Sequence, residues 1–210
     1  MESVSWLSLL AVCTLGAMSP GPSAAVIIQI SSQQGRQHGV IAAIAHGLGV
    51  GCYALIASLG LALVITNDPW IFNSLKWLGA AFLLYLGLRA LGLKPASGAS
   101  SHPEAQPQLT PQSYSRSASA RTGFFIAILN PKVALFFLAL FSQFVNSDAG
   151  TGEKLLMAAL ATSVDIFWFI LVASAVTTAS VADRFSGYGN ILEKVFGVLI
   201  IIVALKVAVG

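Results

Sequence analysis

The stretch GAMSPGPSAAVII, residues 16–28, places two prolines and a glycine inside the first strongly apolar segment of the chain. Each proline removes a backbone donor, and its ring collides with the carbonyl one helical turn earlier. A long apolar segment predicts a membrane helix, yet the bilayer core holds no water to satisfy the freed backbone groups. The sequence therefore predicts a broken helix whose break is buried in protein or lines an internal cavity.

The composition of the chain indicates an integral membrane protein. Of the 210 residues, 56% are hydrophobic and 9% are charged, and the net charge is +3; the mean hydropathy is +0.82. A soluble globular domain carries about 25% charged residues, so this chain cannot cover a surface in water. We expect a lipid bilayer around it and no nucleic-acid partner. With no basic residue before Arg36, the first apolar segment is predicted to be a retained helix rather than a cleaved signal.

Six apolar segments are long enough to cross a bilayer, which takes about 20 residues. They are continuous runs rich in Leu and Ala, and they predict an all-α membrane protein with six transmembrane helices. The long connection at 94–121, rich in Ser, Pro, Gln and Ala, is predicted to be disordered. The predicted spans cover residues 4–30, 39–65, 71–91, 123–145, 155–178 and 191–209.

The linker divides the chain into two three-helix halves, residues 1–93 and 122–210. Because each half has an odd number of spans, the second half enters the membrane in the opposite orientation to the first. If the two halves are related, they form an inverted repeat. Supporting this, Pro22 and Pro131 each fall in the first span of a half. Basic residues gather at the first, third and fifth connections, and the positive-inside rule then predicts a cytoplasmic linker, with both termini external, in the inner (plasma) membrane.

The first candidate site is the run Pro20, Gly21, Pro22 and Ser23. Pro22 suits the first turn of a new half-helix that starts near Gly21. The amides at the start of such a helix can meet an anionic group such as a carboxylate. The alternative is a proline kink that only helps the helices to pack.

The second candidate site is Asn130, Pro131 and Lys132 in the fourth span. A lysine in the middle of a membrane helix costs about 2.5–3.5 kcal/mol on insertion scales, and its side chain can snorkel only part of the way to the interface. We expect Lys132 to face an internal cavity. Snorkelling without a functional role is the alternative.

Further polar residues lie in the second and fifth spans. Asp165 is a candidate for substrate binding and proton coupling, because an acid at membrane depth is a functional hypothesis by default; Lys132 or a substrate ammonium is its candidate partner, and a structural ion pair with Lys132 is the alternative. His46 is either a proton relay or a hydrogen-bonded packing residue. Gly47 and Gly51 have the spacing of a close helix-packing face.

Enzymatic chemistry is not favoured by the sequence. It holds no Walker loop, metal-binding cluster or redox pair, so we expect neither a metal nor a cofactor. Cys13 and Cys52 both lie in apolar segments, which favours packing roles. Ser23 and His46 could suggest a hydrolase dyad, but the serine lacks a G-x-S-x-G setting.

Together these motifs resemble the LysE/RhtB family of small amino-acid exporters. The resemblance covers nearly the whole chain, with MSPGP in the first span, LNPKVALFFLALFSQFV in the fourth and a long polar linker between the halves. Members often carry Asp or Asn where this chain has Ser23, so one group that could hold an ammonium or a proton is missing. The family's motif residues fall on Pro20, Gly21, Pro22, Asn130, Pro131 and Lys132, and Asp165 falls where many members have an acid.

The resemblance implies a secondary transporter that exports amino acids or close derivatives in exchange for protons. In that arrangement amides beside Gly21 meet the substrate carboxylate, Asp165 meets the ammonium or carries the proton, and Lys132 balances the charge. Two alternatives remain open: a non-transporting membrane assembly module, and a uniport channel for small solutes. Association into a homo-oligomer also stays open.

Overall fold

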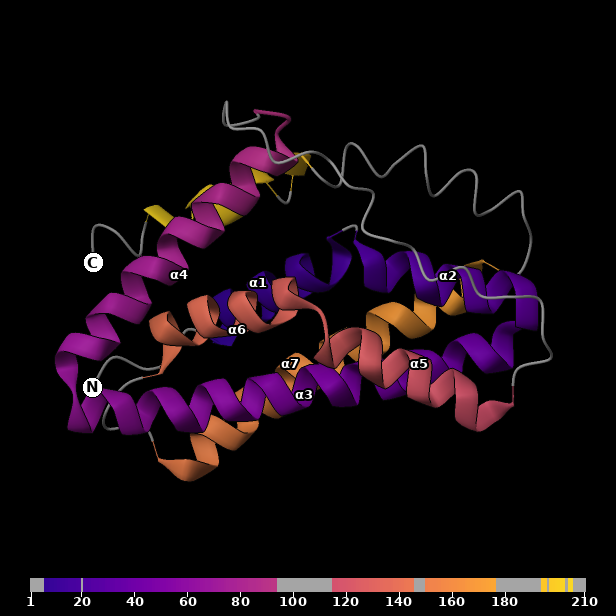
Figure 1. The fold of residues 1–210 in the computed structure, drawn as a ribbon, viewed down its shortest axis with the longest axis horizontal. Coiled ribbons are helices and arrows are strands. Elements are labelled where there is room, and N and C mark those ends of the chain that lie inside the picture. Colours follow the sequence, from indigo (N-terminus) through magenta and orange to yellow (C-terminus); the bar gives the residue numbers. More distant parts are fainter. Residues whose placement is uncertain are drawn as a thin grey trace.

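A computed structural model describes residues 6–19, 21–93, 115–145, 150–176, 194–195, 197–202 and 204–205. Every regular element in these ranges is helical (Figure 1), as the sequence predicts. Further helical residues lie within 194–205. The helices are α1 (Trp6–Met18), α2 (Pro22–Gln34), α3 (Arg36–Asn67), α4 (Pro69–Ala90), α5 (Arg116–Ile128), α6 (Pro131–Phe144) and α7 (Thr151–Ala175).

The first and fourth predicted spans are each two short helices joined at a bend. The angle is 61° between α1 and α2 and 55° between α5 and α6. Pro22 is the first residue of α2 and Pro131 the first of α6, the position where a missing amide hydrogen and a fixed φ suit a helix. The expectation that a half-helix starts beside Gly21 is thereby confirmed.

The long helix α3 lies at the centre of the packing. It contacts α7, α5 and α2, and α4 leaves its far end to pack on α6. A Cβ on Gly47 would lie 2.2 Å from the side chain of Ile166, and one on Gly51 would lie 2.6 Å from the Thr162 hydroxyl. Both glycines therefore lie where α3 and α7 approach too closely for a side chain, the arrangement that small residues permit between membrane helices.

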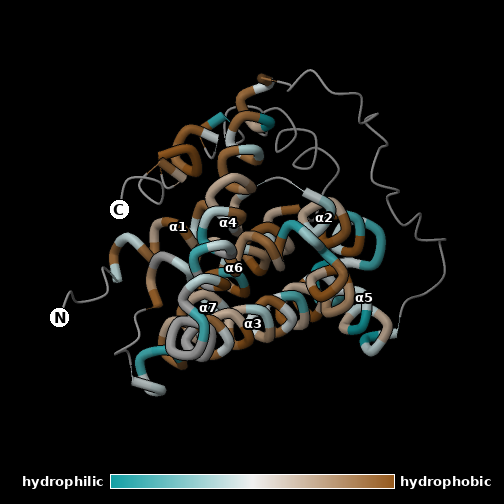
Figure 2. Tube along the Cα trace, turned by 60° about the vertical axis from the view of Figure 1, so that its left-hand side comes forward, coloured by the Kyte–Doolittle hydropathy of each residue, from teal (hydrophilic) through white to brown (hydrophobic). Residues whose placement is uncertain are grey.

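The described helices have the character of membrane helices. Residues Arg36–Leu61 of α3 and all of α7 are long and apolar enough to cross a bilayer, and each bent pair adds one further candidate if it is counted as a single span. Large apolar side chains such as Leu48, Ile56 and Phe167 are exposed, which suits a surface in contact with lipid. Figure 2 shows long hydrophobic stretches in α1 and α4, with hydrophilic residues close to α2 and α5.

The helix α5 begins earlier than the sequence predicts. Its N-cap is Ser115, whose hydroxyl accepts the Ala118 amide at 3.2 Å, and a serine cap stabilises a helix start by about 1 kcal/mol. Residues 116–121, which we expected to belong to a disordered linker, are helical; residues 94–114 lie outside the described part of the chain.

The connection between the first two predicted spans is also shorter than expected. The helix α2 continues to Gln34 and α3 starts at Arg36. Gly35 alone separates them, with a φ of 92° that favours glycine. Polar residues therefore extend both helices beyond their apolar segments, and residues 31–38 are a helix junction rather than a loop.

Candidate functional site

A cavity lies where the two helix bends meet, between α1, α2, α3, α6 and α7. About 60 Å³ of it is open to the centres of water molecules. Six of the residues singled out in the sequence line it, although they come from four different helices: Gly21, Ser23, His46, Asn130, Lys132 and Asp165. Much of the remaining wall is apolar, with Phe136, Phe137 and Phe169 contributing aromatic rings.

Other predicted residues set up the cavity without lining it. Pro22 and Pro131 start the helices α2 and α6. Gly47 and Gly51 lie in the contact between α3 and α7. Pro20 falls outside the described residues.

Two helix N-termini lie at this cavity, and they are completed differently. Asn130 is the N-cap of α6, and its side-chain oxygen accepts the amide of Lys132 at 3.0 Å. Gly21 is the N-cap of α2, has an extended backbone and provides no side-chain cap. Helix N-termini carry a partial positive charge and unsatisfied amides, so the start of α2 is the more available anion-binding group.

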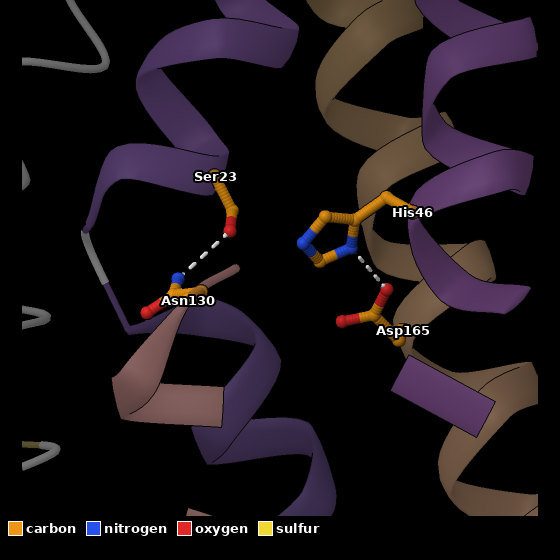
Figure 3. Close-up of polar contacts among 4 residues, drawn as sticks. All are labelled: Ser23, His46, Asn130 and Asp165. Atoms are coloured by element: carbon orange, nitrogen blue, oxygen red, sulfur yellow. Dashed lines mark hydrogen bonds and ion pairs between the residues drawn. The ribbon is translucent and has the colours of Figure 1, made fainter. Parts of the chain in front are cut away.

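The two bends are joined by a hydrogen bond between side chains. Because Asn130 uses its oxygen to cap α6, its amide nitrogen is turned toward Ser23 and donates to that hydroxyl at 3.2 Å (Figure 3). Ser23 is thus an acceptor in this bond, and its own hydroxyl hydrogen can be donated to a ligand.

Lys132 places a positive charge beside the start of α2. Its Nζ donates a hydrogen bond to Ser19, just after the end of α1. The same nitrogen is 3.5 Å from the point where a Cβ on Gly21 would be. The expectation that Lys132 faces an internal cavity agrees with this position, and this wall of the cavity combines a cation with a helix N-terminus.

The opposite wall holds a buried pair that the sequence does not predict. His46 Nδ1 and Asp165 Oδ2 are 2.7 Å apart, and the two residues are 1% and 6% exposed. We expected Lys132 or a substrate ammonium, not His46, to be the partner of Asp165. The position of both residues inside long apolar spans was the only available signal, because sequence spacing does not tell which helix faces which.

The other ring nitrogen of His46 faces the cavity. Among the described residues, Nε2 is one of the buried side-chain atoms without a hydrogen-bond partner. In Figure 3 it points across the gap toward Ser23 and Asn130. The ring of Phe169 packs edge-on against the imidazole, with 4.7 Å between centroids, and helps to hold this orientation.

Fold and site together define a class: an α-helical membrane protein in which two proline-broken helices meet at a cavity with a cationic wall and an acidic wall. A family model described as "LysE type translocator" matches residues 14–210. The chain therefore belongs to the LysE-type translocator family, and the resemblance found in its motifs is confirmed.

Relatives with curated names align along almost their whole length. The homoserine/homoserine lactone efflux protein of Salmonella typhimurium is 29% identical, over 97% of this chain and 95% of its own. The threonine efflux protein of Escherichia coli is 27% identical, over 94% and 97%. YrhP of Bacillus subtilis, named as an uncharacterized membrane protein, is 26% identical over 92% and 95%. No solved structure matches the chain.

Proposed function

We propose that this protein exports small amino acids or close derivatives from the cytoplasm in exchange for protons. The observation that carries the proposal is the opposed charge on the two walls of one buried cavity, with Lys132 and the start of α2 on one side and the His46–Asp165 pair on the other. The relatives named for threonine and homoserine efflux support the same class of solute. Moving such a solute changes no covalent bond, so the proposal is of a transporter and not an enzyme.

The charges fix how a zwitterion would bind. Its carboxylate meets the amides that follow Gly21, the ammonium of Lys132 and the hydroxyl hydrogen of Ser23, because these are the donors on one wall. Its ammonium meets the pair on α3 and α7. Asn130 orients Ser23 by donating to it. Opposed poles of this kind select against solutes that carry only one of the two charges.

The size of the cavity favours a small side chain. The cavity has a volume of about 60 Å³, which is more than a single water molecule needs. A side chain of the size found in threonine or homoserine suits such a space. An aromatic amino acid would require the walls at Phe136 and Phe137 to move apart.

The arrangement of helices supports an inverted repeat of two three-span halves. Each half begins with a pair broken at a proline, α1–α2 and α5–α6, and continues with a long helix, α3 and α7. Transporters built this way place the substrate at the interface of the repeats, where broken helices meet. Six spans, an inner-membrane location, external termini and a cytoplasmic linker belong to the same proposal.

The orientation is tested by replacing Ser100, within the linker, with cysteine. A membrane-impermeant thiol reagent should leave this cysteine unmodified in intact cells and label it after permeabilisation, provided that Cys13 and Cys52 are first replaced by alanine. Labelling in intact cells would show that the orientation is reversed.

The function is tested with the purified protein in proteoliposomes and radiolabelled amino acids. We expect flux of threonine or homoserine that rises when a pH gradient is imposed, with little flux of phenylalanine or of N-acetylthreonine, which keeps the carboxylate but has no ammonium. Flux independent of the gradient would indicate the uniport channel instead. A protein that moves none of these solutes, while remaining folded, would favour the assembly module.

A further inference from the structure

We propose that the substrate ammonium and the coupling proton compete for a single atom, Nε2 of His46, and that Asp165 is the positioning residue that turns this atom into an acceptor. The inference rests on the proposed function and specifies how exchange would be enforced. It changes the role of Asp165 from proton carrier to partner of the carrier.

The short contact with Asp165 determines where the imidazole carries its hydrogen. An ionised carboxylate only accepts hydrogen bonds, so Nδ1, which is 2.7 Å from Oδ2, is the donor. A neutral imidazole has one N–H, and Nε2 is then left with a lone pair. With Asp165 ionised, the pair therefore sets the tautomer.

That lone pair is buried, without a hydrogen-bond partner, and aimed into the cavity. A buried acceptor without a partner is unfavourable until a donor reaches it. A water molecule can donate to this atom, and two charged donors can replace that water: the N–H of a bound ammonium, and a proton. Both need the same lone pair, so only one of them can be present.

Protonation would also reverse the character of this wall. With a proton on Nε2 the ring is a cation that donates on both sides, bonded to Asp165 on one and repelling an ammonium on the other. Deprotonation restores the acceptor. Mutual exclusion of proton and substrate at one site is the property that an antiporter requires.

The other charged or titratable groups at the cavity leave this assignment intact. They are Lys132 on α6 and Cys13 on α1, besides Asp165 on α7. Lys132 lies against Ser19 and the start of α2, on the wall assigned to the carboxylate. The described lining residues of α2, Gly21 and Ser23, carry no charge.

The test measures binding of radiolabelled threonine to the purified full-length protein between pH 5 and 8, the range in which a histidine titrates. As the pH falls through this range, the apparent Kd of the wild type should rise by up to about tenfold per pH unit, because one proton excludes one substrate. His46→Gln keeps an acceptor and cannot titrate, so it should bind with a Kd that does not change over this range.

Two further variants test whether Asp165 positions the imidazole of His46 or itself carries the proton. Asp165→Asn keeps an oxygen that can accept from Nδ1 but removes the negative charge beside the ring, so its pH profile should differ from that of the wild type while a pH dependence remains. His38→Gln is the matched control, because His38 lies on the same helix but bonds to Ser119 of α5, with Nδ1 and Oγ 2.9 Å apart, and does not line the cavity. It should keep the wild-type profile.

The same proteins in proteoliposomes supply the transport readout. His46→Gln should retain exchange of labelled for unlabelled threonine and lose accumulation driven by a pH gradient. Wild-type pH dependence in His46→Gln, together with its loss in Asp165→Asn, would overturn the inference in favour of Asp165 while the proposed function stands. Absence of any amino-acid binding or flux in the wild type would instead overturn the proposed function, and the inference with it.

A measurement on unaltered His46 covers the case in which His46→Gln does not fold. In a background with His38→Gln and His102→Gln, the ultraviolet absorbance of carbethoxyhistidine reports the modification of His46 alone by diethylpyrocarbonate, which reacts with a neutral ring nitrogen. Saturating threonine at neutral pH should slow this modification at least tenfold. An unchanged rate would overturn the inference, because the substrate would then leave Nε2 uncovered.

Discussion

The two helix breaks have the same outline and opposite chemistry. Both bend the chain by about 60°, with values of 61° and 55°, and both start the second helix with a proline. At α6 the N-cap Asn130 satisfies its own helix, whereas at α2 the N-cap Gly21 provides no side-chain cap. We infer that the capped break at α6 has a structural role and that the uncapped break at α2 is the one available for binding.

The second break is completed on its other side as well. The hydroxyl of Tyr53, on α3, donates to the carbonyl of Ile128, the last residue of α5. In contrast, the groups nearest the first break come from the second: Lys132 lies beside Gly21, and Asn130 donates to Ser23. The break between α5 and α6 therefore supplies contacts to the break between α1 and α2.

The largest effect should come from removing the break between α1 and α2. With Pro20→Ala and Pro22→Ala together, the hydrogen-bond ladder between α1 and α2 can close, and threonine export should fall to the background of empty liposomes. Alanine accepts both a broken and a continuous helix, whereas a proline inside a continuous helix would cost about 3 kcal/mol, so the Tm in detergent should hold or rise. Pro131→Ala should keep more activity, since Asn130 still caps α6. Normal export in the double variant would reduce the first break to a packing kink.

The next effect tests whether α2 is open to an anion. Gly21→Asp ties a carboxylate to the N-terminus of α2 beside Lys132, where the substrate carboxylate is proposed to bind. The backbone there is extended, with a φ of −179°, so it accepts any residue. Threonine affinity should fall about 10- to 100-fold, the loss expected for a charged hydrogen bond, while the Tm rises.

Gly21→Asn is the neutral comparison for that variant. Its amide can cap α2 but brings no charge to Lys132, so the loss of threonine affinity should be several-fold smaller than with aspartate. Equal losses in the two variants would show that the added bulk, not the occupied anion site, is responsible.

A smaller effect is expected at the break between α5 and α6. Asn130→Ala removes the cap of α6, which costs about 1 kcal/mol and should lower the Tm by about 2–4 °C in a protein of this size. Asn130→Ser can still accept the Lys132 amide and should recover most of that loss. Thermal unfolding in detergent measures both variants, and an unchanged Tm in Asn130→Ala would mean that the cap is not needed.

The smallest effect concerns the far side of the same break. Tyr53→Phe removes one hydrogen bond to Ile128, worth about 0.5–1.5 kcal/mol, and export should stay at the wild-type rate because Tyr53 does not line the cavity. Tyr85→Phe, on the exposed side of α4, should leave the Tm unchanged. A large loss of export in Tyr53→Phe would mean that the break between α5 and α6 also takes part in binding.

The sequence predicts the positions of the described helices well because apolar length is a local property. Prolines likewise predict where the helices break, and the two motifs identify the family. Helix ends were less predictable: the cap at Ser115 and the junction at Gly35 replace a longer linker and a polar loop. Polar residues continue a helix readily once packing or a cap supports it.

The contacts between side chains inside the cavity could not be predicted from the sequence. His46 and Asp165 are 119 positions apart, and which faces of α3 and α7 meet depends on how both helices rotate and cross. The small residues at 47 and 51 indicate a packing face, but not its partner. Lys132 and Ser19 are separated by 113 positions, so their contact also follows only from the packed fold.

Because Gly35 alone joins α2 to α3, a small rotation at this residue would move the other end of α2 by a larger distance. The helix has 13 residues, about 20 Å at 1.5 Å per residue; one end lies at the cavity and the other at the joint with α3. A rotation of about 10° at Gly35 would displace the Gly21 end by about 3 Å, which is the length of a hydrogen bond. A small change in two dihedral angles at Gly35 would thus be enough to form or break the hydrogen bonds that we propose between the start of α2 and the substrate carboxylate.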